Sequence, residues 1–297
     1  MSVKLGFIGF GEAGSDLAKG LAAAGLADLV AYDIHANGAD RRGETIRERA
    51  AEAGVRLVAS NGELAAAANV LLSVVTANSA EQAADQNAPH LTGEHIYADL
   101  NSVSPGTKQR IAAIINAAGA RFVEVAVMAP VPPYLHKAPM LLNGPTAPEL
   151  AALLAPYGMK FQVIDDKPGV AAATKMCRSV IVKGIESLVM ESMLASTYYG
   201  ADARVWASLD ETFPGMNWKK LADYVVGRVA VHGERRAREM EEVCGTLEEA
   251  GVAPTMSRAI VERMDWSVEQ GMRARWGAEG PKTYAEVAEF VRQGVVR

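Results

Sequence analysis

A glycine fingerprint between a strand and a helix constrains this chain more than any other feature. Residues 3–9, VKLGFIG, form a short apolar run typical of a buried parallel strand. The chain continues as GFGEAG over residues 9–14, a helical pattern follows, and a second strand over 29–32 ends on Asp33. GxGxxG is common by chance. Here the motif lies between a strand and a helix, and an acidic residue follows about twenty positions later. In that context the motif predicts a dinucleotide-binding unit.

The three glycines of the fingerprint have separate expected roles. Gly9 allows the tight turn, Gly11 lets the backbone approach a pyrophosphate, and Gly14 lets the helix pack close to the sheet. The phosphates would sit on the helix N-terminus, where N–H groups and the helix dipole favour anions. The predicted cofactor-binding residues are Gly9, Phe10, Gly11, Glu12, Ala13, Gly14, Asp33, Thr76 and Asn78.

Asp33 bears on the choice of cofactor. Its carboxylate would accept hydrogen bonds from the adenosine ribose hydroxyls and repel a phosphate at that position, which favours NAD over NADP. Arg41 and Arg42 favour NADP instead, because a guanidinium on a flexible loop would bind a 2′-phosphate. Exposed arginines at a helix start explain this pair better. We therefore expect NAD, with NADP left open.

Polar residues follow two further strands at the same edge of the predicted sheet. Strand 70–75 leads into residues 76–79, and strand 96–100 leads into Asn101 and Ser102. Open α/β sheets bind ligands at the carboxyl ends of their strands, so we assign the first loop to the cofactor and the second to the substrate. The alternative at both loops is capping of the helix that follows.

A helix-compatible stretch over 168–200 divides the chain in two. It has no proline after its first residue and ends on a glycine, as expected for one long helix. We predict α/β then all-α: a Rossmann-type, doubly wound, mostly parallel sheet over 1–165, then an all-helical substrate and dimerisation domain over 166–297, joined by the long interdomain helix. The helical patterns after that helix are 201–209, 217–227, 229–250, 254–270 and 282–293.

Composition and charge exclude several classes of protein. The 297 residues carry a net charge of -5, with no extended basic stripe, so nothing favours a nucleic-acid partner. Cys177 and Cys244 lack the spacing of a metal site or a disulfide framework. No window approaches a membrane-spanning apolar run, and no signal-peptide pattern is present. We expect a cytoplasmic protein with no metal and no membrane partner.

With these residues laid out, the chain resembles the β-hydroxyacid dehydrogenase family, whose relatives include 6-phosphogluconate dehydrogenase. The family's nucleotide fingerprint, GFIGxGxxG, is met in full by residues 6–14. Its DxST segment followed closely by proline corresponds to residues 99–105, in which Asn101 replaces the serine. Its catalytic helix begins with a glycine and carries a lysine, matched here by Gly169 and Lys175.

Other family signatures are altered in this chain. The turn DAPVSGG, whose amides hold the substrate carboxylate in the family, reads EVAVMAP over 124–130, which removes both glycines and ends on a proline with no N–H. Ser179 replaces the family asparagine four residues after the lysine, with Arg178 beside it. Residues 238–240 stand where the family has Lys-Asp-Leu. These departures resemble a less studied branch with its own C-terminal domain of poorly defined function.

The resemblance implies that Lys175 is the general acid/base. Its ammonium group would donate to a carbonyl oxygen as hydride arrives, and neutral lysine would accept the hydroxyl proton in the reverse direction. Burial among small apolar residues and the nearby helix N-terminus would lower its pKa, whereas the alternative is a lysine that extends to solvent. The predicted substrate-binding residues are Asn101, Ser102, Met128, Arg178, Ser179 and Arg238.

Two histidines are candidates for a second acid/base group, His136 and His232, although surface or satisfied histidines are common. His232, Arg235 and Glu239 share one helix face, as either a substrate pocket or a solvated salt-bridge face would.

We therefore predict an NAD(P)-dependent oxidoreductase that interconverts a hydroxyl and a carbonyl on a small acidic substrate. The alternatives are an imine reductase-like enzyme and an inactive dinucleotide-binding sensor or scaffold. The resemblance also implies a homodimer built through the C-terminal helices.

Overall fold

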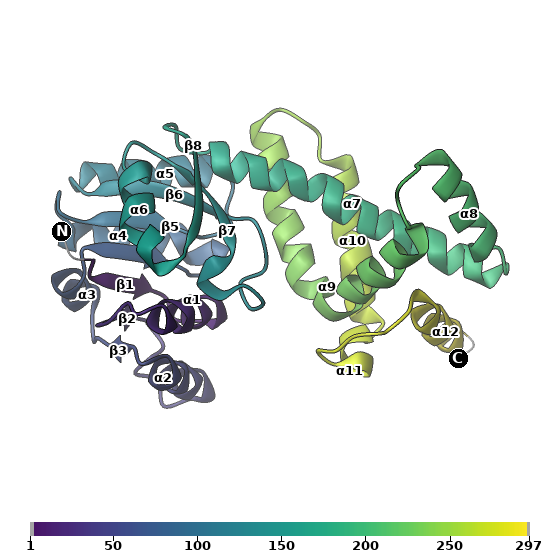
Figure 1. The fold of residues 1–297 in the computed structure, drawn as a ribbon, viewed down its shortest axis with the longest axis horizontal. Coiled ribbons are helices and arrows are strands. Elements are labelled where there is room, and N and C mark those ends of the chain that lie inside the picture. Colours follow the sequence, from purple (N-terminus) through teal and green to yellow (C-terminus); the bar gives the residue numbers. More distant parts are fainter. Residues whose placement is uncertain (1–2, 296–297) are drawn as a thin grey trace. The chain divides into compact units, whose positions relative to one another are not determined.

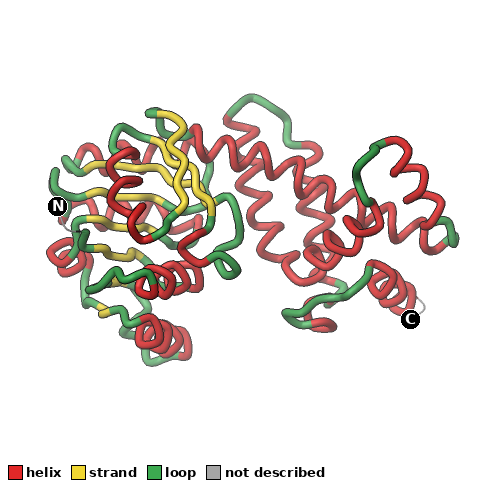
Figure 2. Tube along the Cα trace, viewed as in Figure 1, coloured by secondary structure: helices red, strands yellow, loops and turns green. Residues whose placement is uncertain are grey.

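The computed structural model describes residues 3–295, with an α/β unit followed by an all-helical unit (Figure 1). All strands among the described residues precede residue 166, and helices alone follow it (Figure 2). The predicted fold class is confirmed. The chain separates into two compact units at Lys175 and Met176, within the long helix, whereas the predicted boundary falls where the last strand ends.

One eight-stranded sheet, ordered β3-β2-β1-β4-β5-β6-β7-β8, forms the first unit. Neighbouring strands are parallel except β6 and β7, so the sheet is mostly parallel, as predicted. Every residue of β1 and β4 is buried, as apolar strands covered on both faces require. The strands are β1 (Leu5–Ile8), β2 (Val30–Tyr32), β3 (Arg56–Leu57), β4 (Val70–Ser73), β5 (Ile96–Asp99), β6 (Arg121–Val127), β7 (Pro139–Asn143) and β8 (Lys160–Asp165).

Helices cover both faces of this sheet. Leu17 of α1, Ile46 of α2 and Leu150 of α6 belong to the core on one face. Leu64 of α3 and Ile111 of α5 belong to the core on the other, with α4 beside them. The sheet is therefore doubly wound. The helices are α1 (Glu12–Ala23), α2 (Arg41–Ala53), α3 (Asn61–Ala67), α4 (Ala80–Asn87), α5 (Pro105–Ala117) and α6 (Ala147–Leu154).

The predicted long helix is one continuous element, α7 (Val170–Tyr198). Gly169 precedes it with φ +107° and Gly200 follows it with φ +64°, so each end lies next to a left-handed residue that favours glycine. The methionine-rich part of α7 enters the core of the second unit through Met190 and Met193, both fully buried.

The second unit packs its helices around the middle of α9. Val226, Val229 and Met240 of α9 are fully buried in its core. The predicted helices 217–227 and 229–250 form one helix whose regular geometry breaks at His232, not at the predicted gap. The short helix α11 was not predicted. The helices are α8 (Asp202–Thr212), α9 (Trp218–Glu249), α10 (Thr255–Glu269), α11 (Met272–Trp276) and α12 (Tyr284–Val295).

No helix among residues 3–295 combines the length and apolar character needed to cross a bilayer.

Candidate functional site

Two glycines of the fingerprint occupy positions where a side chain would be crowded, more severely at Gly9 than at Gly14. Gly9 follows β1 with φ +83°, and a Cβ there would lie 2.7 Å from Val75 Cγ1 and 2.8 Å from the Val74 carbonyl oxygen. A Cβ on Gly14 would lie 3.0 Å from the carbonyl oxygen of Gly9. The turn after β1 is therefore tight against the end of β4, and α1 packs directly on that turn.

Gly11 differs from its two neighbours in the motif. No described atom lies within 4 Å of a Cβ built on it, and its φ of -75° suits any residue. Gly11 is the N-cap residue of α1 and brings no side chain to the first turn of that helix. Space therefore lies open before a helix N-terminus at the switch point between β1 and β4, and these residues fit the pyrophosphate of a dinucleotide.

Asp33 ties the end of β2 to the fingerprint. Its Oδ2 accepts a hydrogen bond from the Phe10 backbone N–H at 2.8 Å, and its Oδ1 accepts one from the His35 backbone N–H at 2.9 Å. An ionised carboxylate has about four acceptor sites, so ribose hydroxyls can still donate to it. Arg41 and Arg42 are exposed in the first turn of α2, after the N-cap residue Asp40.

The Asn101 side chain turns inward, below the loop predicted to bind substrate. Its Oδ1 accepts from the Val75 backbone N–H at 2.7 Å, and its Nδ2 donates to Ser73 Oγ at 2.9 Å and to Asp99. Asn101 is buried and joins the ends of β4 and β5, whereas Ser102 is half-buried. Substrate contact by either residue stays a prediction.

The helix caps agree only in part with the alternatives that the sequence left open. Ser104 is the residue that caps α5, with its Oγ accepting from the Thr107 backbone N–H at 3.3 Å, so neither Asn101 nor Ser102 has that role. In the other loop Ser79 is the N-cap residue of α4, as the alternative proposed. Its side chain makes no capping hydrogen bond, and its hydroxyl lies 3.0 Å from Thr76 Oγ1. Asn78 lies in the 3₁₀ turn Ala77–Ser79 and is exposed, next to the carboxyl end of β4.

A buried ion pair that sequence reasoning missed lies under the substrate-side loop. Lys108 Nζ lies 2.9 Å from Asp99 Oδ2, with side chains 1% and 0% exposed. The same ammonium donates to the Asp99 carbonyl oxygen at 2.7 Å. Burial, followed by the charge of Asp99, raises the pKa of Tyr97. The detectable signal was the spacing of Lys108 with Ile111 and Ile115, which places the lysine on the apolar face of α5.

Glu124, in the middle of β6, holds the start of α7. Its fully buried carboxylate accepts from the Gly169 and Ala172 backbone N–H groups, each at 2.6 Å, and from Asn143 Nδ2 at 3.2 Å. Donors from the first turn of a helix and the positive end of its dipole both attract the carboxylate oxygens. The signal for this contact was a lone acidic residue inside the apolar strand FVEVAV.

Lys175 lies in the second turn of α7, about one turn after Ala172, whose backbone N–H Glu124 binds. It is half-buried, and its neighbours Ala171, Ala172 and Met176 are buried. Ser179, one turn farther along, is half-buried, whereas Arg178 is exposed. The catalytic role of the lysine and the substrate contacts of the other two stay predictions.

Arg238 makes its contacts with acidic residues of the second unit. Its Nη2 lies 2.6 Å and 2.8 Å from the two carboxylate oxygens of Asp265, and its Nη1 donates to Glu241. The hydrogen bond to Asp265 raises the pKa of Arg238. Met128, at the end of β6, is half-buried and donates its backbone N–H to the Pro139 carbonyl at 2.9 Å. Neither contact tests their predicted role with substrate.

The face of α9 that carries Arg235 and Glu239 is partly buried. A fully solvated salt-bridge face does not explain this burial. Glu239 pairs with Arg235 and also lies 2.8 Å from Nζ of Lys183, whose side chain is 6% exposed. Burial lowers the pKa of Lys183, while the charge of Glu239 acts in the opposite direction. His232 lies at the break in α9, and His136 lies buried against Gly20 of α1.

A doubly wound sheet with a glycine fingerprint at its switch point, followed by an all-helical unit, defines the class of dinucleotide-binding proteins. Residues 4–131 match the NAD binding domain of 6-phosphogluconate dehydrogenase, and residues 197–267 match a domain of unknown function (DUF1932). The chain belongs to the 6-phosphogluconate dehydrogenase-like family of β-hydroxyacid dehydrogenases, in the branch with this C-terminal domain.

Solved structures agree with this family. A conserved hypothetical protein from Sinorhizobium meliloti is 41% identical, with 89% of this chain and 88% of that chain covered and a TM-score of 0.77. A conserved protein of unknown function with structural similarity to 3-hydroxyacid dehydrogenases is 29% identical, with 91% and 98% covered and a TM-score of 0.74. Mycobacterium tuberculosis 3-hydroxyisobutyrate dehydrogenase, studied with L-serine, has the same fold at 15% identity, with 98% and 100% covered and a TM-score of 0.74.

Proposed function

We propose that the protein is an NAD(P)-dependent oxidoreductase that interconverts a hydroxyl and a carbonyl on a small acidic substrate, with Lys175 as general acid/base. The observation that carries this proposal is the position of Lys175 on α7. The lysine lies about one turn after Ala172, and Glu124 binds the backbone N–H groups of both Gly169 and Ala172, so its helix starts from a fixed point on β6. A catalytic group needs this kind of rigid support.

The nicotinamide supplies the hydride chemistry when bound. The open start of α1 would receive the pyrophosphate, and Asp33 would accept hydrogen bonds from the adenosine ribose. Lys175 would hold a proton near the substrate oxygen, donating it during carbonyl reduction and accepting it during alcohol oxidation. Ser102 and Ser179 are hydroxyl groups suited to orienting the substrate, and Arg178 supplies a cation for a carboxylate.

The altered turn over 124–130 supports a substrate other than the usual small hydroxyacid. In this chain the first residue of that turn, Glu124, uses both carboxylate oxygens on the start of α7. The glycines whose amides would hold a carboxylate are absent from the sequence. Recognition of an acidic group is therefore assigned to side chains such as Arg178 and Arg238.

The test is turnover of a substrate panel by Lys175→Ala, with Lys160→Ala as an exposed lysine control. The panel holds β-hydroxy acids, simple alcohols and cyclic imines, followed by the absorbance of the reduced nicotinamide. We expect Lys175→Ala to bind dinucleotide normally and to lose about 10²- to 10⁴-fold in kcat, the usual contribution of general acid/base catalysis. Near wild-type turnover by this variant would show that the lysine assignment is wrong.

The same panel separates the alternatives. Turnover of cyclic imines but not of hydroxy acids would favour an imine reductase-like enzyme, although relatives with that activity usually replace the lysine. Dinucleotide binding without turnover of any class would favour a sensor or scaffold. Calorimetric titration with both dinucleotides decides the cofactor, and tighter binding of NADP than NAD would overturn our interpretation of Asp33.

A homodimer through the C-terminal helices is also part of this proposal. Ile181 and Leu188 lie seven residues apart on α7 and are 65% and 61% exposed, so they share a face that a second copy could cover. We expect light scattering to give twice the chain mass for the wild type and one chain mass for the double variant Ile181→Lys, Leu188→Lys. A monomeric wild type would contradict this assignment.

A further inference from the structure

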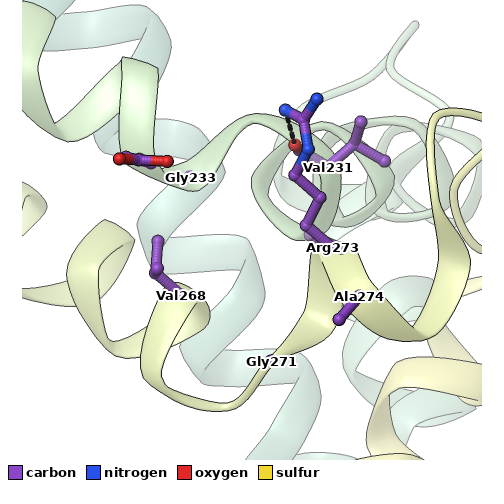
Figure 3. Close-up of a pocket in the computed structure, with 8 residues that line it drawn as sticks. Val231, Gly233, Val268, Gly271, Arg273 and Ala274 are labelled. Carbon is purple, nitrogen blue, oxygen red and sulfur yellow. Dashed lines mark hydrogen bonds between the residues drawn. The ribbon is translucent and has the colours of Figure 1, made fainter.

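Helix α9 bends at His232 because neighbouring elements hold it in that shape. His232 has φ -119° and ψ 15°, outside the helical range. The Val231 carbonyl oxygen accepts from Arg273 Nη1 at 3.2 Å, the dashed contact in Figure 3. Gly233, the residue after His232, packs against α10, because a Cβ added to it would lie 2.2 Å from Ser267 Oγ. A break without proline that side chains stabilise in this way is a common mark of a functional site.

Two cavities flank the bend, and both are lined by Val231. The cavity drawn in Figure 3 has a volume of about 460 Å³ and is mainly apolar, with Val231, Val268 and Ala274 among its walls. The second has a volume of about 420 Å³, is more open to solvent than the first, and lies between α9 and residues 278–282. Volumes of this size accommodate small organic molecules.

The second cavity is lined by an excess of basic groups. Lys220 and Arg228 of α9 and Lys282 of the facing loop carry positive charge, and the His232 imidazole lies with them. Two acidic residues also line it. Asp223 accepts from the Tyr284 backbone N–H at 2.9 Å, and Glu279 is exposed. The lining therefore carries net positive charge before the imidazole is counted.

Arg228 connects this cavity to buried charges behind it. Its Nε lies 3.5 Å from Glu186 Oε1, while Glu186 also pairs with Arg236, both of them 2% exposed. Lys183 and Glu239 form the adjoining pair. The cluster therefore holds three cations that are less than one-third exposed and two carboxylates, Glu186 and Glu239. One positive charge is left uncompensated within the described contacts. The Arg236 Nε atom is buried without a hydrogen-bond acceptor among the described residues.

An uncompensated cation in a partly buried cluster is costly, so an anion bound nearby would stabilise the folded unit. Burial, followed by the charges of Arg235, Arg236, Arg228 and Arg273, lowers the pKa of His232. The imidazole is therefore held neutral, able to donate one N–H, and an oxyanion placed beside it would raise its pKa.

We propose that the cavity between α9 and residues 278–282 binds a small organic molecule bearing a carboxylate or phosphate group, with Arg228 and His232 contacting the oxyanion and Lys220 and Lys282 at its rim. This inference rests on the second unit alone and goes beyond the proposed function. It requires neither bound dinucleotide nor an active Lys175.

The test is calorimetric titration of the whole protein, without dinucleotide, against succinate and inorganic phosphate at constant ionic strength. We expect saturable binding of at least one probe. The probe that binds more tightly shows whether the site prefers a carboxylate or a phosphate. Lys220→Gln should weaken that binding at least threefold and Arg228→Gln at least tenfold. The neighbouring Lys219→Gln, a control because Lys219 does not line the cavity, should bind like the wild type.

A second measurement does not depend on whether the Arg228 variant folds. The His232 pKa, followed by NMR, should rise when the probe binds to the wild type and rise less in Lys220→Gln. Binding should also survive Lys175→Ala, which separates this inference from the proposed dehydrogenase chemistry. Absence of saturable binding by either probe would overturn the proposal, as would equal weakening by Lys219→Gln and Lys220→Gln, because that pattern indicates general charge attraction.

Discussion

Glu124 and Gly169 lie 45 residues apart in the sequence, and the carboxylate of one accepts the backbone N–H of the other at 2.6 Å. A second oxygen of the same carboxylate binds the Ala172 N–H, so a strand side chain takes the place of an N-terminal cap on α7. The helix that carries Lys175 therefore begins from a fixed point on the sheet.

We expect Glu124→Gln to lower the free energy of unfolding by about 2 kcal/mol, because the amide keeps one acceptor and turns an N–H donor toward a helix N–H. The measurement is urea unfolding followed by circular dichroism. Glu149→Gln is the control, since Glu149 pairs with Arg121 at the surface and should cost less than about 1 kcal/mol. Equal losses for the two variants would contradict the capping role.

Gly11→Ala and Gly9→Ala should separate cofactor binding from stability. The methyl group at position 11 enters open space at the N-cap of α1, so the free energy of unfolding should fall by no more than about 1 kcal/mol while NAD binds at least tenfold more weakly. The methyl at position 9 meets Val74 and Val75 at positive φ and should cost about 1–3 kcal/mol. Wild-type affinity in Gly11→Ala would exclude pyrophosphate binding at this turn.

His136 should make the protein less stable in mild acid. Burial, helped by the charge of Lys137, lowers the pKa of His136 below its ordinary value. The unfolded chain then binds the extra proton more readily, so stability is fully present above about pH 6.5 and falls as the pH drops through the lowered pKa. The measurement is chemical unfolding across this pH range.

His136→Gln should flatten that pH dependence, whereas the exposed His90→Gln should leave it unchanged. His232 shares the direction of shift and accounts for a remaining slope. The same slope in His136→Gln as in the wild type would show that other groups carry the effect.

Gly233→Ala and Gly245→Ala, both on α9, should change stability in opposite directions. A Cβ at 233 would lie 2.2 Å from Ser267 Oγ and 3.0 Å from the Met264 carbonyl oxygen, and this overpacking should cost about 1–3 kcal/mol. At 245 no described atom lies within 4 Å, so alanine should add about 0.5–1 kcal/mol through its higher helix propensity. Thermal unfolding tests both, and a destabilising Gly245→Ala together with a neutral Gly233→Ala would contradict the packing described here.

Local patterns predicted the elements whose signals are short-range. The apolar runs of β1 and β4, the fingerprint over 9–14 and the single helix α7 follow from periodicity, glycine positions and the absence of internal proline. These features also predicted the fold class, because a strand–turn–helix fingerprint followed by helices alone admits few architectures. The family was inferred from the resemblance of the motifs over 6–14, 99–105 and 169–175.

Local sequence patterns could not predict contacts between residues that are distant in the sequence. Glu124 resembles any acidic residue in a strand until its carboxylate is seen on α7, and Lys108 resembles a surface lysine until its burial on Asp99 is seen. The gap predicted near residue 228 moved to His232 because Ser267 and Arg273, which hold the bend, come from later helices.

The sequence by itself predicted the architecture and the position of the dinucleotide, since local periodicity and turn chemistry encode them, and its motifs carried the resemblance to the family. Tertiary structure alone decided that Asn101 turns inward, that Glu124 starts α7 and that basic groups gather beside the bend in α9. Each of these depends on residues brought together across 26 or more positions of chain, and burial and charge pairing over such separations arise only when the chain is folded.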